Sequence, residues 1–203
     1  MTTLYQQQGS GNCYKARMML ARSGMSFSIV DINSLEGGTR TPEFLALNPD
    51  GKVPFLTLDN GRALGESNAI MLYLAEGGEL LPKDSWQRAK VYQWLFWEQY
   101  THEPAIAVRR AFLFYESKRG LASERRLEML LKNGEQALSF MDARLQQSEW
   151  LAGDSPTVAD LSLYAYTHMA EQGGFSLSKY PAVCQWLTSV EKLPGHVNID
   201  WRP

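Results

Sequence analysis

Cysteine and histidine are scarce in this sequence, and their scarcity excludes several kinds of chemistry. The two cysteines, Cys13 and Cys184, lie far apart and form no Cys-x-x-Cys pair. Neither a disulfide scaffold nor a dithiol redox centre is therefore indicated. The three histidines show no metal-ligand spacing, so we expect no metal site.

Basic clusters and long hydrophobic runs are also absent. The formal net charge is -2, and the adjacent arginines occur only as short pairs, Arg109-Arg110 and Arg125-Arg126. Nucleic-acid binding is therefore not expected. The N-terminus lacks the basic and apolar regions of a signal peptide, and no apolar run is long enough to span a bilayer. We expect a cytoplasmic protein that does not bind membranes.

The composition is that of a folded globular protein with two small domains or one large one. The chain has 203 residues, of which 44% are hydrophobic, enough to form cores. Glycine, proline and charge replace the apolar pattern between Gly77 and Ser85, which is typical of a domain boundary. We predict a domain at 1–78, a linker at 79–85 and a second domain at 86–203.

The first domain has the pattern of an α/β fold. Residues 3–6 and 26–32 are expected to be strands on either side of a glycine-containing loop and a helix at 13–21, which makes a βαβ unit. The later elements expected are a short helix at 42–45, hairpin strands at 55–58 and 62–64, and a helix at 67–75.

The second domain is predicted to be entirely helical. Pro104 should end or kink its first helix, and the residue pair Thr157 and Asp160 has the spacing of a capping box. The helices expected are at 86–101, 106–115, 123–145, 161–169 and 181–190.

The dipeptide Val53-Pro54 follows turn residues and precedes a predicted strand. Pro54 has no N–H to donate to a sheet, so the chain must bend or expose its backbone here. A cis bond would turn the N–H and C=O of Val53 outward, where they could bind an extended peptide. The alternative is an ordinary proline on an edge strand.

Glu66-Ser67 stands directly before the apolar run 69–74, with Ser67 near the N-cap of the predicted helix. The N–H groups at a helix start can bind a carboxylate, and Glu66 can hold a neighbouring ammonium group. An amino acid head group would need both. The alternative is that Ser67 only caps the helix.

These motifs, in this order, resemble the N-terminal domain of the glutathione transferases, and residues 157–186 resemble the family's helical domain. Val53-Pro54 corresponds to the family's cis-proline turn, and Glu66-Ser67 to the pair that holds the γ-glutamyl group of glutathione. The resemblance implies a thioredoxin-like α/β N-terminal domain followed by an all-α C-terminal domain. It also implies a homodimer, with its two-fold axis expected near the aromatic segment 86–100.

The resemblance further implies that glutathione is the co-substrate. The bound thiolate would attack a small electrophile, a peroxide or a disulfide, so transferase, peroxidase and disulfide reductase activities are all consistent with it. The alternative from another functional class is a relative that binds glutathione or a protein partner without chemistry.

The resemblance places the thiol of glutathione over residues 10–13. Gln6 stands where many relatives have a tyrosine, and Gly11 stands near where others have a cysteine, so we expect Asn12, with Ser10 beside it, to donate to the sulfur. The alternative is that both residues only cap the helix. Arg40 and Lys52 could pair with the glycine carboxylate or could simply be solvated surface residues.

Cys13 needs a separate prediction because it lies at a helix start, where a thiol can be activated. Cys13, Ala16 and Leu20 share one helical face, which we expect to face the core, whereas Lys15 and Arg17 should project elsewhere. A thiol that faces the core has a raised pKa. We therefore predict that Cys13 is inert.

Overall fold

The computed structural model describes all 203 residues and contains two compact units. One unit comprises Met1–Gly78 together with Pro194–Pro203, and the other comprises Glu79–Leu193. Residues 194–203, which we predicted to belong to the second domain, lie in the first unit. They lie there because side chains of that unit bind their backbone carbonyls, among them Tyr14 and Arg17.

The predicted linker, 79–85, also differs from the structure. Leu80 and Leu81 are buried, and Leu80 O accepts a 3.0 Å hydrogen bond from the Val158 N–H. This segment is therefore packed into the second unit rather than exposed as a connection.

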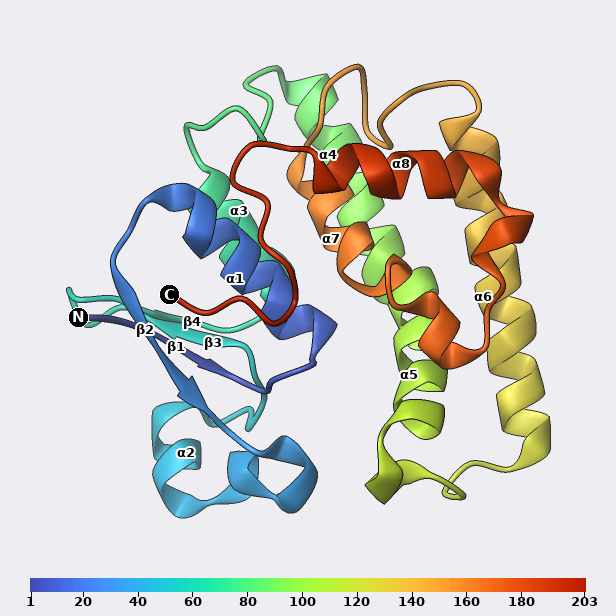
Figure 1. The fold of residues 1–203 in the computed structure, drawn as a ribbon. Coiled ribbons are helices and arrows are strands. Elements are labelled where there is room, and N and C mark those ends of the chain that lie inside the picture. Colours follow the sequence, from blue (N-terminus) through green and yellow to red (C-terminus); the bar gives the residue numbers. More distant parts are fainter. The chain divides into compact units, whose positions relative to one another are not determined.

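The first unit is a four-stranded sheet with helices on both faces (Figure 1). The strand order is β2-β1-β3-β4, with β1 parallel to β2 and antiparallel to β3, and with β3 antiparallel to β4. This topology confirms the predicted thioredoxin-like α/β fold. The elements are β1 (Thr2–Gln6), α1 (Gly11–Ser23), β2 (Phe27–Asp31), α2 (Pro42–Leu47), β3 (Phe55–Thr57), β4 (Ala63–Leu64) and α3 (Ser67–Ala75).

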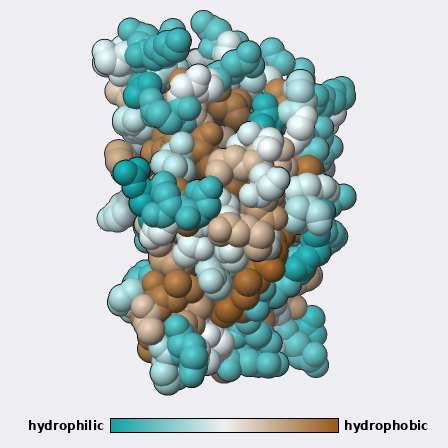
Figure 2. Space-filling view, turned by 90° about the vertical axis from the view of Figure 1, so that its left-hand side faces the viewer, coloured by the Kyte–Doolittle hydropathy of each residue, from teal (hydrophilic) through white to brown (hydrophobic).

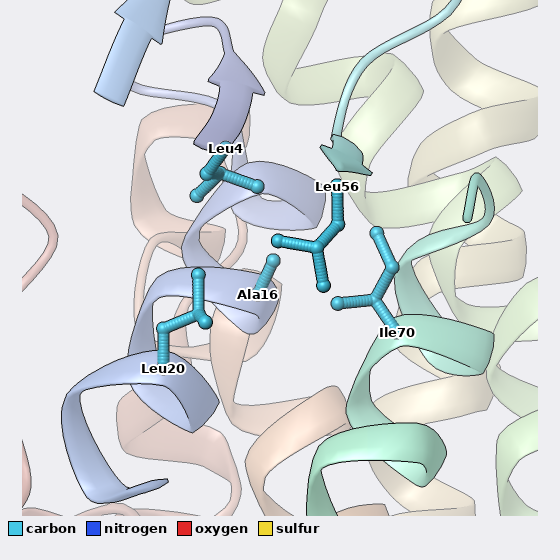
Figure 3. Close-up of a cluster of buried hydrophobic side chains, with 5 residues drawn as sticks. All are labelled: Leu4, Ala16, Leu20, Leu56 and Ile70. Carbon is cyan, nitrogen blue, oxygen red and sulfur yellow. The ribbon is translucent and has the colours of Figure 1, made fainter. Parts of the chain in front are cut away.

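Two helices, α1 and α3, pack side by side on one face of the sheet (Figure 1). Figure 3 shows the side chains that join them to the strands, which are Leu4, Ala16, Leu20, Leu56 and Ile70. On the opposite face Tyr5 contacts Phe44 of α2, with ring centroids 6.2 Å apart. Burial of this apolar cluster fixes where α1 and α3 begin, which is where the candidate site lies.

The second unit is helical, as predicted. Its helices are α4 (Ser85–Trp97), α5 (Glu103–Phe114), α6 (Glu124–Leu145), α7 (Val158–Thr167) and α8 (Pro181–Glu191). A π-helical turn, Glu98–His102, joins α4 to α5, and Pro104 lies in the first turn of α5, where its missing N–H does no harm. The first helix thus ends at Trp97, before Pro104, and the backbone stays helical through the π turn into α5, rather than ending at Pro104 as predicted.

Helix α7 begins with the predicted capping box. Thr157 and Asp160 make reciprocal hydrogen bonds, and the buried Asp160 carboxylate also accepts from Leu151 N–H and Trp186 Nε1 at 3.0 Å each. His102 makes a 2.9 Å hydrogen bond to Thr167 in the interior of the same unit. These buried polar groups link separate helices of the bundle.

No helix in the structure combines the length and the apolar character needed to cross a bilayer. Figure 2 shows hydrophobic residues in separate groups among hydrophilic ones on the face turned to the viewer. Scattered groups of this kind are normal on a protein surface.

Candidate active site

The candidate site lies in the first unit, where α1 and α3 begin. Ser67 Oγ donates a 3.3 Å hydrogen bond to Asn12 Oδ1. Ser67 is only 5% exposed, whereas Asn12 is half-buried. Since the amide oxygen of Asn12 is an acceptor here, Nδ2 is the atom of that side chain that could donate to a ligand. The structure thus brings together two residues that the sequence placed in one site.

Helix α1 is capped by Ser10. Its Oγ accepts a 3.4 Å hydrogen bond from the Cys13 N–H, and its backbone is extended, as an N-cap requires. The hydroxyl proton of Ser10 is not used in this bond. The same hydroxyl also hydrogen-bonds the Cys13 thiol, so donation to a ligand above the helix would have to replace that bond.

Cys13 is fully buried, as predicted. Burial raises the pKa of its thiol to about 11, although the hydrogen bonds with Gln7 and Ser10 and the charge of Arg17 oppose this rise. The Gln7 N–H donates to Cys13 Sγ at 3.2 Å. Near neutral pH, Cys13 is therefore a protonated thiol enclosed in the fold rather than a nucleophile.

Helix α3 begins at Ser67, as predicted, but its cap lies one residue earlier than expected. Glu66, not Ser67, is the N-cap residue, and its side chain makes no capping hydrogen bond. Glu66 is exposed, and its φ of 63° is unusual for a residue other than glycine. Such a backbone conformation is strained and is concentrated at ligand-binding sites. Because the Ser67 hydroxyl donates to Asn12, the interpretation of Ser67 as a simple helix cap is wrong.

The Val53-Pro54 bond is cis. Pro54 precedes β3 rather than lying within it, and neither the N–H nor the C=O of Val53 has a hydrogen-bond partner within the chain. The interpretation as an ordinary edge-strand proline is thereby excluded. An extended peptide could pair with these two backbone groups.

Arg40 and Lys52 lie on either side of Asp50. Arg40 Nη1 donates to Asp50 O at 3.3 Å, and Lys52 Nζ is 3.0 Å from Asp50 Oδ2. Both cations are exposed, so their interactions with Asp50 are weak and an anionic ligand could compete for them.

Sequence reasoning missed the burial of Lys15 and Arg17. Both are fully buried on α1 rather than projecting outward. Arg17 contacts Gln6, Gln8 and Ile199, and the return of residue 199 to this helix could not be seen in any local pattern.

No group of three or more His, Cys, Asp or Glu side chains converges in a way that could hold a metal ion. Near the site, Glu66 is exposed, and Lys52 is paired with Asp50.

Comparisons with known proteins agree with this arrangement. Residues 9–76 match the glutathione S-transferase N-terminal domain, and residues 105–194 match the C-terminal domain. A glutathione S-transferase from Xanthobacter autotrophicus Py2 is 46% identical, with 98% of this chain and 97% of that chain covered and a TM-score of 0.94.

Two solved structures from Pseudomonas fluorescens Pf-5 are also similar. A glutathione S-transferase is 42% identical over 98% of each chain, with a TM-score of 0.94. A glutathione transferase family member with two glutathione bound is 25% identical over 96% of this chain and 89% of that chain, with a TM-score of 0.81. Both domain matches and these near full-length relatives show that this chain belongs to the glutathione S-transferase family.

Proposed function

We propose that this chain binds glutathione at the starts of α1 and α3 and stabilises its thiolate for attack on an electrophile. The observation that carries the proposal is the 3.3 Å hydrogen bond from Ser67 Oγ to Asn12 Oδ1. It holds two helix N-termini together, and each of them favours negative charge. The P. fluorescens relative with two glutathione bound supports the choice of ligand.

The γ-glutamyl head group would bind at the start of α3. Its carboxylate would accept hydrogen bonds from Ser67 Oγ and from backbone N–H groups of the first turn. The exposed Glu66 carboxylate would pair with its ammonium group. The strained backbone of Glu66 fits this role, because it is maintained at a position where no capping hydrogen bond explains it.

The rest of glutathione would extend past Val53. The N–H and C=O of Val53 would pair with the cysteinyl backbone in the manner of an added β-strand. The glycine carboxylate would then approach Arg40 and Lys52 and compete with Asp50 for Lys52.

The thiol would lie over the start of α1. A free thiol has a pKa of about 8.5, so reaching half thiolate at neutral pH requires a decrease of roughly 1.5–2 units, or about 2–3 kcal/mol. Asn12 Nδ2, the Ser10 hydroxyl and the α1 dipole could together supply a stabilisation of that size. Asn12 and Ser10 are therefore the proposed catalytic residues.

In the proposed reaction the thiol proton passes to solvent, and the sulfur lone pair forms a bond to the electrophilic atom. With a carbon electrophile, the bond to the leaving group breaks and the leaving group departs with the electron pair. With a hydroperoxide the sulfur bonds to the terminal oxygen, the O–O bond breaks, and an alkoxide leaves with the electron pair and becomes the alcohol, while the sulfur is oxidised to a sulfenic acid. With a disulfide the S–S bond breaks, a new disulfide forms, and a thiolate leaves with the electron pair. The rival proposal is a family member that binds glutathione or a protein without any of these steps.

The test combines binding and turnover. Calorimetry should show glutathione binding, and turnover would be measured with a chromogenic aryl halide, an organic hydroperoxide and a glutathione-linked disulfide. Asn133 is an exposed residue of α6, so Asn133→Ala is a matched control for Asn12→Ala. Turnover that falls in Asn12→Ala alone supports the proposal. Tight binding without turnover of any substrate class supports the rival. The absence of glutathione binding refutes the proposal and leaves only the protein-binding form of the rival.

We also propose a homodimer that uses the aromatic surface of α4 and the following π-helical turn. Phe96 is 73% exposed and Tyr100 is 88% exposed. Large aromatic side chains left in water favour an interface that covers them. A two-fold axis near this surface would bring the same residues of both copies together.

A further inference from the structure

Arg17 is a fully buried cation without a carboxylate partner. Its Nη1 donates to Gln6 Oε1 and, at 3.4 Å, to Gln8 Oε1, and its Nη2 donates to the backbone carbonyl of Ile199. Burial lowers the pKa of Arg17. The buried Nε of Arg17 has no hydrogen-bond partner. The neutral oxygens bound by Nη1 and Nη2 are therefore partners that this buried charge cannot easily lose.

Further contacts attach the C-terminal segment, Pro194–Pro203, to the same place. Gln8 Nε2 donates to Ile199 O and to Asp200 Oδ1, both at 3.4 Å. The Tyr14 hydroxyl donates to Val197 O at 2.6 Å. The segment is thus bonded by both the β1–α1 loop and helix α1.

The ends of β1 and β2 complete this attachment. Gln6 Nε2 donates to Asp31 Oδ1 at 2.9 Å, and Asp31 Oδ2 forms an ion pair with Arg202. Burial raises the pKa of Asp31, but the hydrogen bonds from Arg202 and Gln6 and the charges of Arg202 and Arg17 outweigh it, so the pKa lies below its ordinary value. The chain Arg17, Gln6, Asp31, Arg202 is therefore a continuous polar network.

This network holds the residues that lead into the candidate site. Three hydrogen bonds fix Gln7. Its N–H donates to Cys13 Sγ, and its C=O accepts from the Ser10 N–H at 3.2 Å. Its side-chain oxygen accepts from the Ser34 N–H at 2.8 Å. Its neighbours Gln6 and Gln8 are the two residues that Arg17 binds. The loop that ends at Ser10 therefore contacts α1 on one side and the C-terminal segment on the other.

We propose that Arg17 and residues 197–202 are positioning residues for the thiolate site, since they hold the Gln6–Gln8 backbone in place. They keep Ser10 and Asn12 aimed at the sulfur without touching glutathione themselves. This inference rests on the proposed function, because it assigns a thiol to that position. Displacements of about 1 Å in such donors are enough to weaken catalysis substantially.

Three variants and one control test the proposal. Deletion of residues 199–203 removes Ile199 O, Asp200 and Arg202 together. Arg17→Lys keeps the charge but loses the fork of donors. Arg202→Ala is the mildest change, because it removes only the ion pair with Asp31, and it serves if the deletion variant does not fold. The control is Arg22→Ala, since Arg22 binds the same segment at Pro194 O, beyond the far end of α1.

The first readout needs no ligand. Hydrogen exchange of the amides at residues 7–13 should accelerate about tenfold or more in the deletion variant, less in Arg17→Lys, and not at all in Arg22→Ala. The second readout is the pKa of the bound glutathione thiol, followed by thiolate absorbance, which should rise by about one unit in the deletion variant. kcat near neutral pH should fall several-fold, while KM for glutathione stays within about threefold because Val53 and Ser67 are untouched.

The outcomes separate the two proposals. Unchanged exchange at residues 7–13 in a folded deletion variant overturns the positioning role, and so does equal acceleration in Arg22→Ala, which would indicate general loosening. Faster exchange with an unchanged thiol pKa overturns the link to the thiolate. If the unaltered protein fails to bind glutathione in calorimetry, the proposed function fails, and exchange alone still decides whether the segment holds the loop.

Discussion

The hydroxyl of Ser67 and the amide of Asn12 are joined by one 3.3 Å hydrogen bond that crosses from α3 to α1. In the proposed complex the same hydroxyl would donate to the γ-glutamyl carboxylate, and it has a single proton to give. Binding of the head group at α3 should therefore change the hydrogen bonding of the residue proposed to stabilise the thiolate at α1. The two ends of the site are expected to be coupled.

Ser67→Ala should weaken glutathione binding and also alter the bound thiol. Loss of a hydrogen bond to a charged group, worth roughly 1.5–3 kcal/mol, corresponds to a decrease in affinity of about ten- to a hundredfold. Calorimetry measures the affinity, and thiolate absorbance measures the thiol pKa. Ser139 lies exposed on α6, so Ser139→Ala should change neither. Unaltered affinity in Ser67→Ala would remove Ser67 from the site.

Asn12→Ala should change the bound thiol and the turnover, whereas Cys13→Ala should leave both nearly unchanged. Asn12→Ala should raise the pKa of the bound thiol by about one to two units and lower turnover at saturating glutathione. Cys13→Ala should keep most of the activity and the same thiol pKa, because its own thiol is buried and protonated. Loss of activity in Cys13→Ala, together with a glutathione adduct in the unaltered protein alone, would establish a cysteine-based mechanism instead.

The buried thiol of Cys13 should make the protein less stable in alkali. Burial raises its pKa from 9.0 to about 11, so the unfolded chain loses this proton at a lower pH than the folded protein does. The contribution to stability is complete below pH 9 and is lost as the pH rises from 9 to 11. Two pKa units amount to about 3 kcal/mol. Urea titrations from pH 8 to 11 should show a steeper decline for the unaltered protein than for Cys13→Ala, and parallel curves would contradict this.

Asp160→Ala should destabilise the protein by about 3–5 kcal/mol, because it leaves several buried donors without an acceptor. Its carboxylate accepts four hydrogen bonds, from Leu151 N–H, Thr157 N–H, Thr157 Oγ1 and Trp186 Nε1. Asp84 also caps a helix, accepting from the Gln87 N–H at 2.9 Å, but it is exposed. Asp84→Ala should therefore cost only about 1 kcal/mol. Denaturant unfolding compares the two, and similar losses would show that the buried network adds nothing.

Phe96→Glu and Tyr100→Glu should convert the proposed homodimer to monomer. A charge placed in a desolvated aromatic interface is strongly unfavourable. Light scattering at micromolar concentration should report a dimer for the unaltered protein. Leu121 is 72% exposed outside this surface, so Leu121→Glu should leave the mass unchanged. A monomeric unaltered protein would end the dimer proposal.

Elements with local signals could be predicted from the sequence. The expected helix at 67–75 matches α3, and the predicted capping box at Thr157 starts α7. A capping box is a short-range interaction between side chain and backbone, which depends little on the rest of the chain. At Val53-Pro54 the residues allowed a cis bond at low cost, and the family resemblance implied it; the bond is cis.

The rest depends on contacts that no local pattern reveals. Arg17 was expected to project outward, yet it is buried against Ile199, 182 residues later in the chain. Glu66 was not expected at the N-cap, because a positive φ is not recognisable from a glutamate. The division of roles among Asn12, Ser10 and Ser67 depends on how two separate helices meet, which tertiary packing decides.

The return of residues 194–203 to the first unit makes that unit discontinuous in the chain, with the whole helical unit inserted within it. During synthesis the sheet of the first unit can form early. The Ile199 carbonyl that binds Arg17, however, becomes available only after residues 79–193 have been made. Until then Arg17 has its partners Gln6 and Gln8 but lacks Ile199, and the β1–α1 loop lacks its contacts with residues 199 and 200. For the same reason, a protein fused after residue 203 would be attached to the unit that holds the proposed glutathione site, although the helical unit directly precedes that segment in the sequence.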